Sequence, residues 1–157
     1  MPTLMTEIPI QSVPPATELA GATLFYDGTC GFCSKTIQFI LKHERHNRSL
    51  RFATLQGPLA ASLRDKYPVL NDTDSVVWYE SPTPARKERL LVRSSAGIRV
   101  ARYLGGIWSI LGVLGWCIPR PLRDGLYKLV ARNRYRIAGT NDSCLLPTPE
   151  QRARFLE

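Results

Sequence analysis

Cys30 and Cys33 are the residues of this 157-residue chain whose type and spacing point most directly to chemistry. They close the run Asp27-Gly28-Thr29-Cys30-Gly31-Phe32-Cys33. Two thiols at this spacing can form a disulfide with little backbone movement. If they stand where a helix begins, its unpaired N–H groups and partial positive charge favour a thiolate. The pattern predicts thiol–disulfide exchange.

The two thiols are expected to play different parts. Cys33 begins an apolar helical stripe and should face the core, whereas Cys30 precedes the helix and should be exposed. We therefore expect Cys30 to attack a substrate disulfide and Cys33 to resolve the mixed disulfide. Asp27 has two interpretations: it transfers a proton, more plausibly at Cys33 than at Cys30, or it bonds N–H groups of the turn.

A metal-binding module is the alternative use of the same two cysteines, and two buried cysteines that only fill space are another. Zinc takes about four ligands, and the chain has no second Cys-x-x-Cys and no close Cys/His pair. Further ligands would have to come from Cys117, Cys144, His43 or His46, at spacings unlike those of zinc sites. We therefore expect redox chemistry, with no metal and no cofactor.

The elements that position the pair follow from periodicity and turn chemistry. Residues 22–26 favour a strand, and the turn residues at 27–29 end it. Apolar residues then recur at helical spacing from Gly31 to about Glu44, so a helix should begin at the cysteines. The expected elements that follow are a strand at 50–55, a helix opened by Pro58 and ended by Pro68, two strands at 75–80 and 89–93, and a helix at 96–104 capped by Ser94 or Ser95.

This order, β-α-β-α-β-β-α, predicts an α/β domain with a four-stranded mixed sheet and additional C-terminal helices. It is the order of a thioredoxin-like fold. The length suits one domain. We expect residues 22–157 to form it, including the helical extension and tail, after an extended, proline-containing N-terminal tail at residues 1–21.

Two C-terminal stretches have distinctive composition. Residues 107–118 are apolar but too short to span a membrane, which favours a buried helix with Trp108 and Trp116 in the core. Residues 119–136 predict a basic amphipathic helix, whose apolar stripe comprises Leu122, Leu126, Leu129 and Val130. We expect that stripe to pack and the basic face to be solvated. The alternative is a nucleic-acid or membrane adaptor that uses this helix.

The net charge of +8 favours acidic partners without naming one. We nevertheless expect no stable nucleic-acid or membrane partner. The N-terminus has no basic residue ahead of an apolar run and so does not resemble a secretory signal, which favours a cytoplasmic location.

The motif formed by Asp27, Cys30 and Cys33 resembles that of the thiol-disulfide oxidoreductase DCC family. Further runs similar to the family pattern stand at 42–45, 52–56, 74–77, 93–96, 118–124, 131–135 and 144–155. The resemblance implies a thioredoxin-like domain with dithiol–disulfide activity. Its partner would be a disulfide-containing substrate or a low-molecular-weight thiol.

One stretch departs from better-known thioredoxin-like enzymes, which usually have a cis-proline facing the cysteine pair. Thr73, Asp74 and Ser75 stand there instead, and Asp74 and Ser75 either line the site or cap the turn. Cys144, in the C-terminal tail, either acts as an auxiliary resolving thiol near the pair or fills a small apolar gap.

Overall fold

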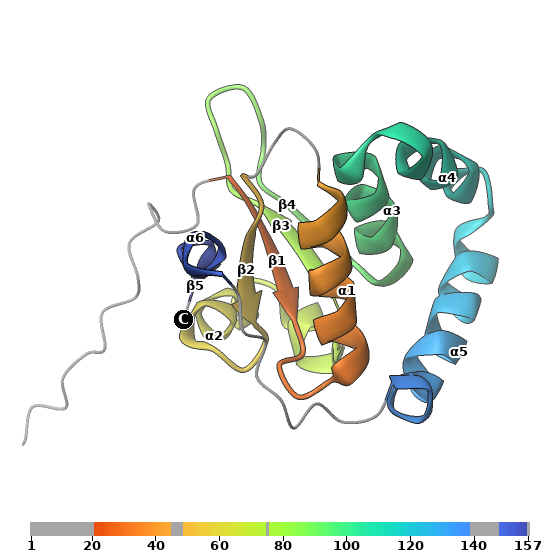
Figure 1. Ribbon diagram of the computed structural model, residues 1–157, viewed down its shortest axis with the longest axis horizontal. Helices are drawn as coiled ribbons and strands as arrows, with labels where there is room; N and C mark the ends of the chain where they lie inside the picture. Colours follow the sequence, from red (N-terminus) through yellow and green to blue (C-terminus); the bar gives the residue numbers. More distant parts are fainter. Residues whose placement is uncertain (1–20, 45–48, 75, 139–147, 157) are drawn as a thin grey trace, which may run out of the picture.

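A mixed β-sheet forms the centre of the molecule (Figure 1), seen in a computed structural model that describes residues 21–44, 49–74, 76–138 and 148–156. Within these residues the sheet has five strands in the order β4-β3-β1-β2-β5. Central β1 pairs parallel with β2 and antiparallel with β3; β5 lies parallel beside β2, and β4 antiparallel beside β3. Their bounds are β1 Ala22–Tyr26, β2 Arg51–Thr54, β3 Val77–Glu80, β4 Arg89–Val92 and β5 Phe155–Leu156.

Both faces of the sheet are covered by helices, and alternation along β1 supplies both cores. Leu24 and Tyr26 join the apolar cluster that includes residues of α1 (Gly31–His43) and α3 (Arg93–Leu104). Phe25 points the other way, into the cluster formed with α2 (Pro58–Arg64) and the 3₁₀ helix η1 (Pro68–Asp72). The short α6 (Pro149–Arg152) immediately precedes β5.

Two further helices, α4 (Gly106–Trp116) and α5 (Arg120–Ala138), form an outer layer on the α1/α3 side (Figure 1). Gly105, with φ of 70°, makes the turn between α3 and α4. Gly112 lets the two helices approach closely, since a Cβ there would lie 3.2 Å from the Cβ of Ala101. Helix α5 packs against both α1 and α3 and thereby reaches the start of α1.

Most predicted elements are confirmed, but the expected number of strands is wrong. The fold is mixed α/β with five strands rather than four, because Phe155 and Leu156 add a short parallel strand at the β2 edge. A two-residue strand is too short to show any alternation. The two separate helices expected at 107–118 and 119–136 are confirmed, since α4 ends at Trp116 and α5 begins at Arg120.

Two helix boundaries differ from those expected. Helix α3 begins at Arg93 with Val92 as its N-cap, so neither Ser94 nor Ser95 caps it. The Ser94 hydroxyl instead donates to Asp124 of α5 and accepts from Arg123. Pro68 does not end α2, which stops at Arg64; it opens η1, as its fixed φ allows.

The expectation that both C-terminal helices bury their apolar residues is wrong for most of them, although Trp108 of α4 packs against the core cluster as expected. Trp116 of α4 is 74% exposed, and the Leu122 and Leu126 side chains of α5 are 68% and 62% exposed. Arg134, which sequence reasoning assigned to the solvated basic face, is instead buried. Helix α5 therefore turns a polar face inward and leaves its apolar stripe outside.

Candidate functional site

The two cysteines stand at the junction of β1 and α1, as expected. Cys30 is the N-cap of α1, in extended conformation, and its carbonyl accepts the first helical bond from the N–H of Ser34. Its own N–H donates to the carbonyl oxygen of Asp27. Both Cys30 and Cys33 are free thiols rather than a disulfide, so this is the reduced form of the pair.

Exposure does not distinguish the two thiols. Cys30, expected to be exposed, is 0% exposed, and Cys33 is 2% exposed. The prediction for Cys30 is wrong because this cysteine, like Cys33, belongs to the apolar cluster that includes residues of the sheet, α1 and α3. Local periodicity cannot reveal such tertiary packing.

Protonation does distinguish Cys33. Burial, and then the negative charge of a Cys30 thiolate, raise the pKa of the Cys33 thiol to about 12. Cys33 is therefore a thiol, not a thiolate, at neutral pH.

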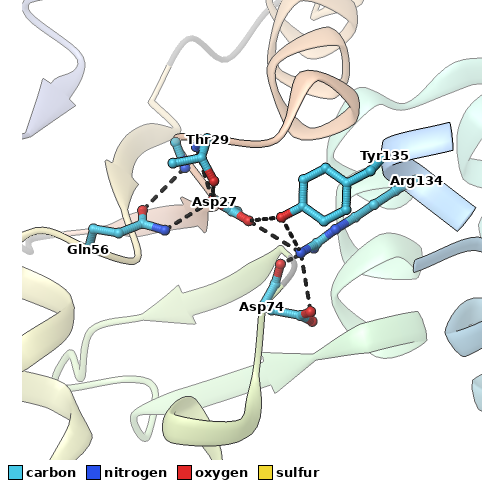
Figure 2. Close-up of polar contacts among 7 residues, drawn as sticks. Asp27, Thr29, Gln56, Asp74, Arg134 and Tyr135 are labelled. Carbon is cyan, nitrogen blue, oxygen red and sulfur yellow. Dashed lines mark hydrogen bonds and ion pairs between the residues drawn. The ribbon is translucent and has the colours of Figure 1, made fainter. Parts of the chain in front are cut away.

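Asp27 is the centre of a polar network beside the pair (Figure 2). Its Oδ1 accepts hydrogen bonds from the backbone N–H and hydroxyl of Thr29 and from Nε2 of Gln56. Its Oδ2 accepts from the Tyr135 hydroxyl at 3.0 Å and from the Arg134 guanidinium at 3.3 Å. Burial opposes the charge, but the bonds from Thr29, Tyr135 and Gln56 lower the pKa of Asp27 below its ordinary value. Asp27 is thus held as a carboxylate.

Arg134 connects this network to the segment before β3. Its guanidinium donates to the backbone carbonyl of Asp74 and lies 3.2 Å from the Asp74 carboxylate (Figure 2). Burial disfavours its charge, yet the negative charge of the Asp74 carboxylate and a hydrogen bond to the Tyr135 hydroxyl oxygen raise the pKa of Arg134. A permanently charged cation therefore lies within electrostatic reach of both cysteines.

An apolar cavity of about 190 Å³ adjoins the pair between α1, α3 and α5. Cys33 lines this cavity, together with Phe32, Val76, Tyr127 and Val130. Arg134 also lines the cavity, so the Cys33 thiol and the Arg134 guanidinium border the same apolar space.

Of the three residues predicted as auxiliary, the structure describes only Asp74. Asp74 is brought to the site through Arg134, although its own side chain is 76% exposed. Ser75 and Cys144 lie outside the described residues. Where the chain is described, no group of three or more His, Cys, Asp or Glu side chains comes close enough to hold a metal ion.

Sequence reasoning missed Gln56, Arg134 and Tyr135 as site residues. The signal lay in the runs 52–56 and 131–135, which were noted as similar to a family pattern but given no role. Gln56 is the second residue after β2, and Arg134 and Tyr135 lie in the last turns of α5, up to 108 residues from Asp27 in the chain.

Comparisons with known proteins identify a family and relatives similar to this chain. Residues 24–140 match the sequence profile of the DCC1-like thiol-disulfide oxidoreductase family. The chain is 34% identical over 140 residues to the uncharacterized protein YuxK of Bacillus subtilis, covering 88% of this chain and 96% of that protein. It is 32% identical over 126 residues to a chloroplastic DCC family protein of Arabidopsis thaliana, covering 78% and 68%. No solved structure matches significantly.

Proposed function

This chain belongs to the DCC1-like thiol-disulfide oxidoreductase family, and from that premise we propose that Cys30 and Cys33 perform thiol–disulfide exchange in a thioredoxin-like domain. The observation that carries the proposal is a pair of free thiols at the start of α1, beside a buried arginine. Parallel β1 and β2 with α1 between them, followed by the antiparallel β3–β4 hairpin, support the fold assignment.

The proposed reaction begins with attack of the Cys30 thiolate on one sulfur of a substrate disulfide. A mixed disulfide forms, and the other substrate sulfur leaves as a thiolate and takes up a proton. Cys33 then loses its proton and attacks the sulfur of Cys30, which closes the Cys30–Cys33 bond and releases the second substrate thiol. The substrate gains two electrons and the protein loses two; with a thiol as donor the same steps run in reverse.

The division of roles is supported by electrostatics rather than by exposure. The raised pKa of Cys33 leaves this thiol protonated, so it is a poor first nucleophile. Cys30 stands at the helix N-terminus, where partial positive charge favours a thiolate, and Arg134 adds a full charge nearby. Once the mixed disulfide removes the charge on Cys30, one cause of the raised pKa of Cys33 disappears, and Cys33 becomes easier to activate.

Asp27 serves in this proposal as a positioning residue. A proton carrier needs a pKa near the working pH, whereas the pKa of Asp27 is lowered and both its oxygens are occupied by donors. Its carboxylate fixes the turn that carries Cys30 and orients Arg134. The partner we propose is a protein disulfide or a low-molecular-weight disulfide or thiol.

Trapping experiments test the proposal and the assignment of roles together. In reaction with a disulfide such as oxidised glutathione, Cys33→Ser should accumulate a mixed disulfide at Cys30, detectable by mass spectrometry of peptides, whereas Cys30→Ser should form none at Cys33. Cys117→Ser, which removes the exposed cysteine, is the matched control and should behave as wild type. Equal trapping in both site variants would contradict the roles.

A redox titration tests the activity itself. Wild type equilibrated with reduced and oxidised glutathione should form the Cys30–Cys33 disulfide in a single two-electron step. A pair that stays reduced at every glutathione ratio would overturn the proposed function.

A further inference from the structure

Helices α4 and α5 expose an apolar surface for which the thiol chemistry has no use. Among the described residues, the exposed large apolar side chains gather on and between these two helices: Ile107, Ile110, Leu111, Val113, Leu114, Trp116, Ile118, Leu122, Leu126, Leu129, Val130 and Ile137. The other exposed large apolar residues in the described part of the chain are Phe32, Val69 and Tyr135, and they lie outside this group. We call these twelve side chains the apolar surface. Clustering of this kind marks a binding surface rather than ordinary solvent exposure.

The periodicity of α5 shows that its part of the surface is continuous. Leu122, Leu126 and Leu129 follow one another at spacings of four and three residues, which places them on one face of the helix. The inward face is a different one, because it carries buried Arg134, and Tyr127 and Ala131 there line the cavity beside Cys33. Helix α4 likewise turns Gly112 toward α3 and its large aliphatic residues outward.

Charge identifies what would cover the surface. Lys128, Arg132 and Arg136 recur at intervals of four residues and form a basic stripe next to the apolar stripe of α5, and Arg120 adds an exposed cation at the helix start. The single acidic residue between Gly106 and Ala138 is Asp124, which accepts a hydrogen bond from Ser94 of α3. The surface is therefore apolar and cationic, without a free carboxylate.

We propose that α4 and α5 dock the protein on an anionic lipid surface. The apolar side chains would enter the boundary between headgroups and acyl chains, while the basic stripe would meet phosphate groups. Exposed Trp116 suits that boundary, where one end of an indole is apolar and the other wet. No helix among the described residues is long and apolar enough to cross a membrane, so the mode is peripheral. A second copy would bring one basic stripe against another, which makes it the less favourable occupant.

The proposal differs from the sequence-based expectation of no membrane partner, because the apolar stripe of α5 is exposed in the folded protein. It is independent of the redox function. Apart from Val130, which also lines the cavity beside Cys33, thiol exchange and lipid binding use different residues of α5, so either activity can fail without the other.

Vesicle binding tests the proposal with the full chain. We expect vesicles of phosphatidylcholine and phosphatidylglycerol to bind wild type and vesicles of phosphatidylcholine alone to bind it at least about tenfold more weakly, with binding reduced by salt. Trp116 should report insertion directly through a blue shift of its fluorescence and protection from acrylamide. Both signals should be lost in Trp116→Phe, because Trp78 is buried and Trp108 packs against Phe39 and His43 of α1.

Two pairs of variants separate the apolar and cationic contributions. Leu126→Gln with Leu129→Gln should weaken vesicle binding by about tenfold or more, whereas Val69→Gln, an exposed apolar residue on η1, should not change it. Arg132→Glu with Arg136→Glu should weaken binding by about tenfold or more, while Arg86→Glu with Lys87→Glu changes net charge equally on the β3–β4 loop and should have a much smaller effect.

Circular dichroism confirms that each variant folds. Two results would overturn the proposal: no binding of wild type to anionic vesicles, or equal binding by wild type and the Leu126→Gln, Leu129→Gln variant. A third result would replace the proposal with an interface between two copies of the chain. In that case wild type would not bind lipid, and sedimentation would show a concentration-dependent dimer that the leucine variant does not form.

Discussion

At the scale of single residues, Asp27 is the point where three distant parts of the chain meet. Its carboxylate receives donors from the turn before α1, from Gln56 after β2 and from the end of α5. Such a carboxylate is held both charged and in one orientation. The geometry of the Cys30 turn therefore depends on the ionisation of a residue that exchanges no electrons.

Asp27→Asn should lower the free energy of unfolding at neutral pH by about 2 kcal/mol, because an amide places N–H groups where donors already point. Since the pKa of Asp27 is lowered in the folded protein, the stabilisation is present above its ordinary value of 3.8 and lost as pH falls below it. Urea unfolding at neutral pH and near pH 3 should thus show a shrinking difference between variant and wild type. Exposed Asp65→Asn is the control, and a difference independent of pH would contradict the argument.

Arg134→Gln should destabilise the protein by about 3 kcal/mol, because it leaves the buried Asp27 without its cation. Arg136→Gln removes an equal charge from an exposed position two residues away and should change stability little. Chemical unfolding of both variants measures the contrast. Equal effects would mean that Arg134 contributes only to net charge.

At the scale of elements, sequence periodicity predicted helices and strands correctly where an element buries one face in the nearest core. The strand expected at residues 22–26 is confirmed with the same bounds, because β1 is central and its turn residues are distinctive. Strand β5 was not predictable, since two residues show no period and its pairing depends on β2, about a hundred residues earlier. The Cys30–Cys33 pair was predictable from local spacing, whereas Arg134 was not, because its inward direction is set by tertiary packing.

The attachment of β5 gives a prediction at this scale. Arg154 forms an ion pair with Glu44, whose side chain is 3% exposed, and donates to the carbonyl of Leu50. Arg154→Ala should therefore lower the free energy of unfolding by about 3 kcal/mol, because Glu44 would stay buried without its cation. Exposed Arg152→Ala is the matched control. Thermal unfolding that gives the two variants equal stability would show that β5 adds nothing to the sheet.

At the scale of the whole molecule, the sheet carries a second layer of helices on one side. Helix α3 packs on the sheet, and α4 and α5 pack on α3 and α1 rather than on the strands. An amphipathic pattern identifies an apolar stripe but not what the stripe packs against. This is why the sequence predicted both C-terminal helices and yet assigned their apolar residues to the core.

The complete burial of Cys30 has a kinetic consequence. A reagent reaches a sulfur that is 0% exposed only after the structure around Cys30 opens, so its modification contains a unimolecular step before the bimolecular one. The rate of modification by an aromatic disulfide reagent should rise with reagent concentration and then reach a plateau equal to the opening rate. Arg134→Gln should raise that plateau, whereas a rate that stays proportional to reagent concentration would show that the thiol is freely accessible. A pair gated in this way would be shielded from stray oxidants, and the rate of the proposed thiol–disulfide exchange would be limited by how often the protein opens.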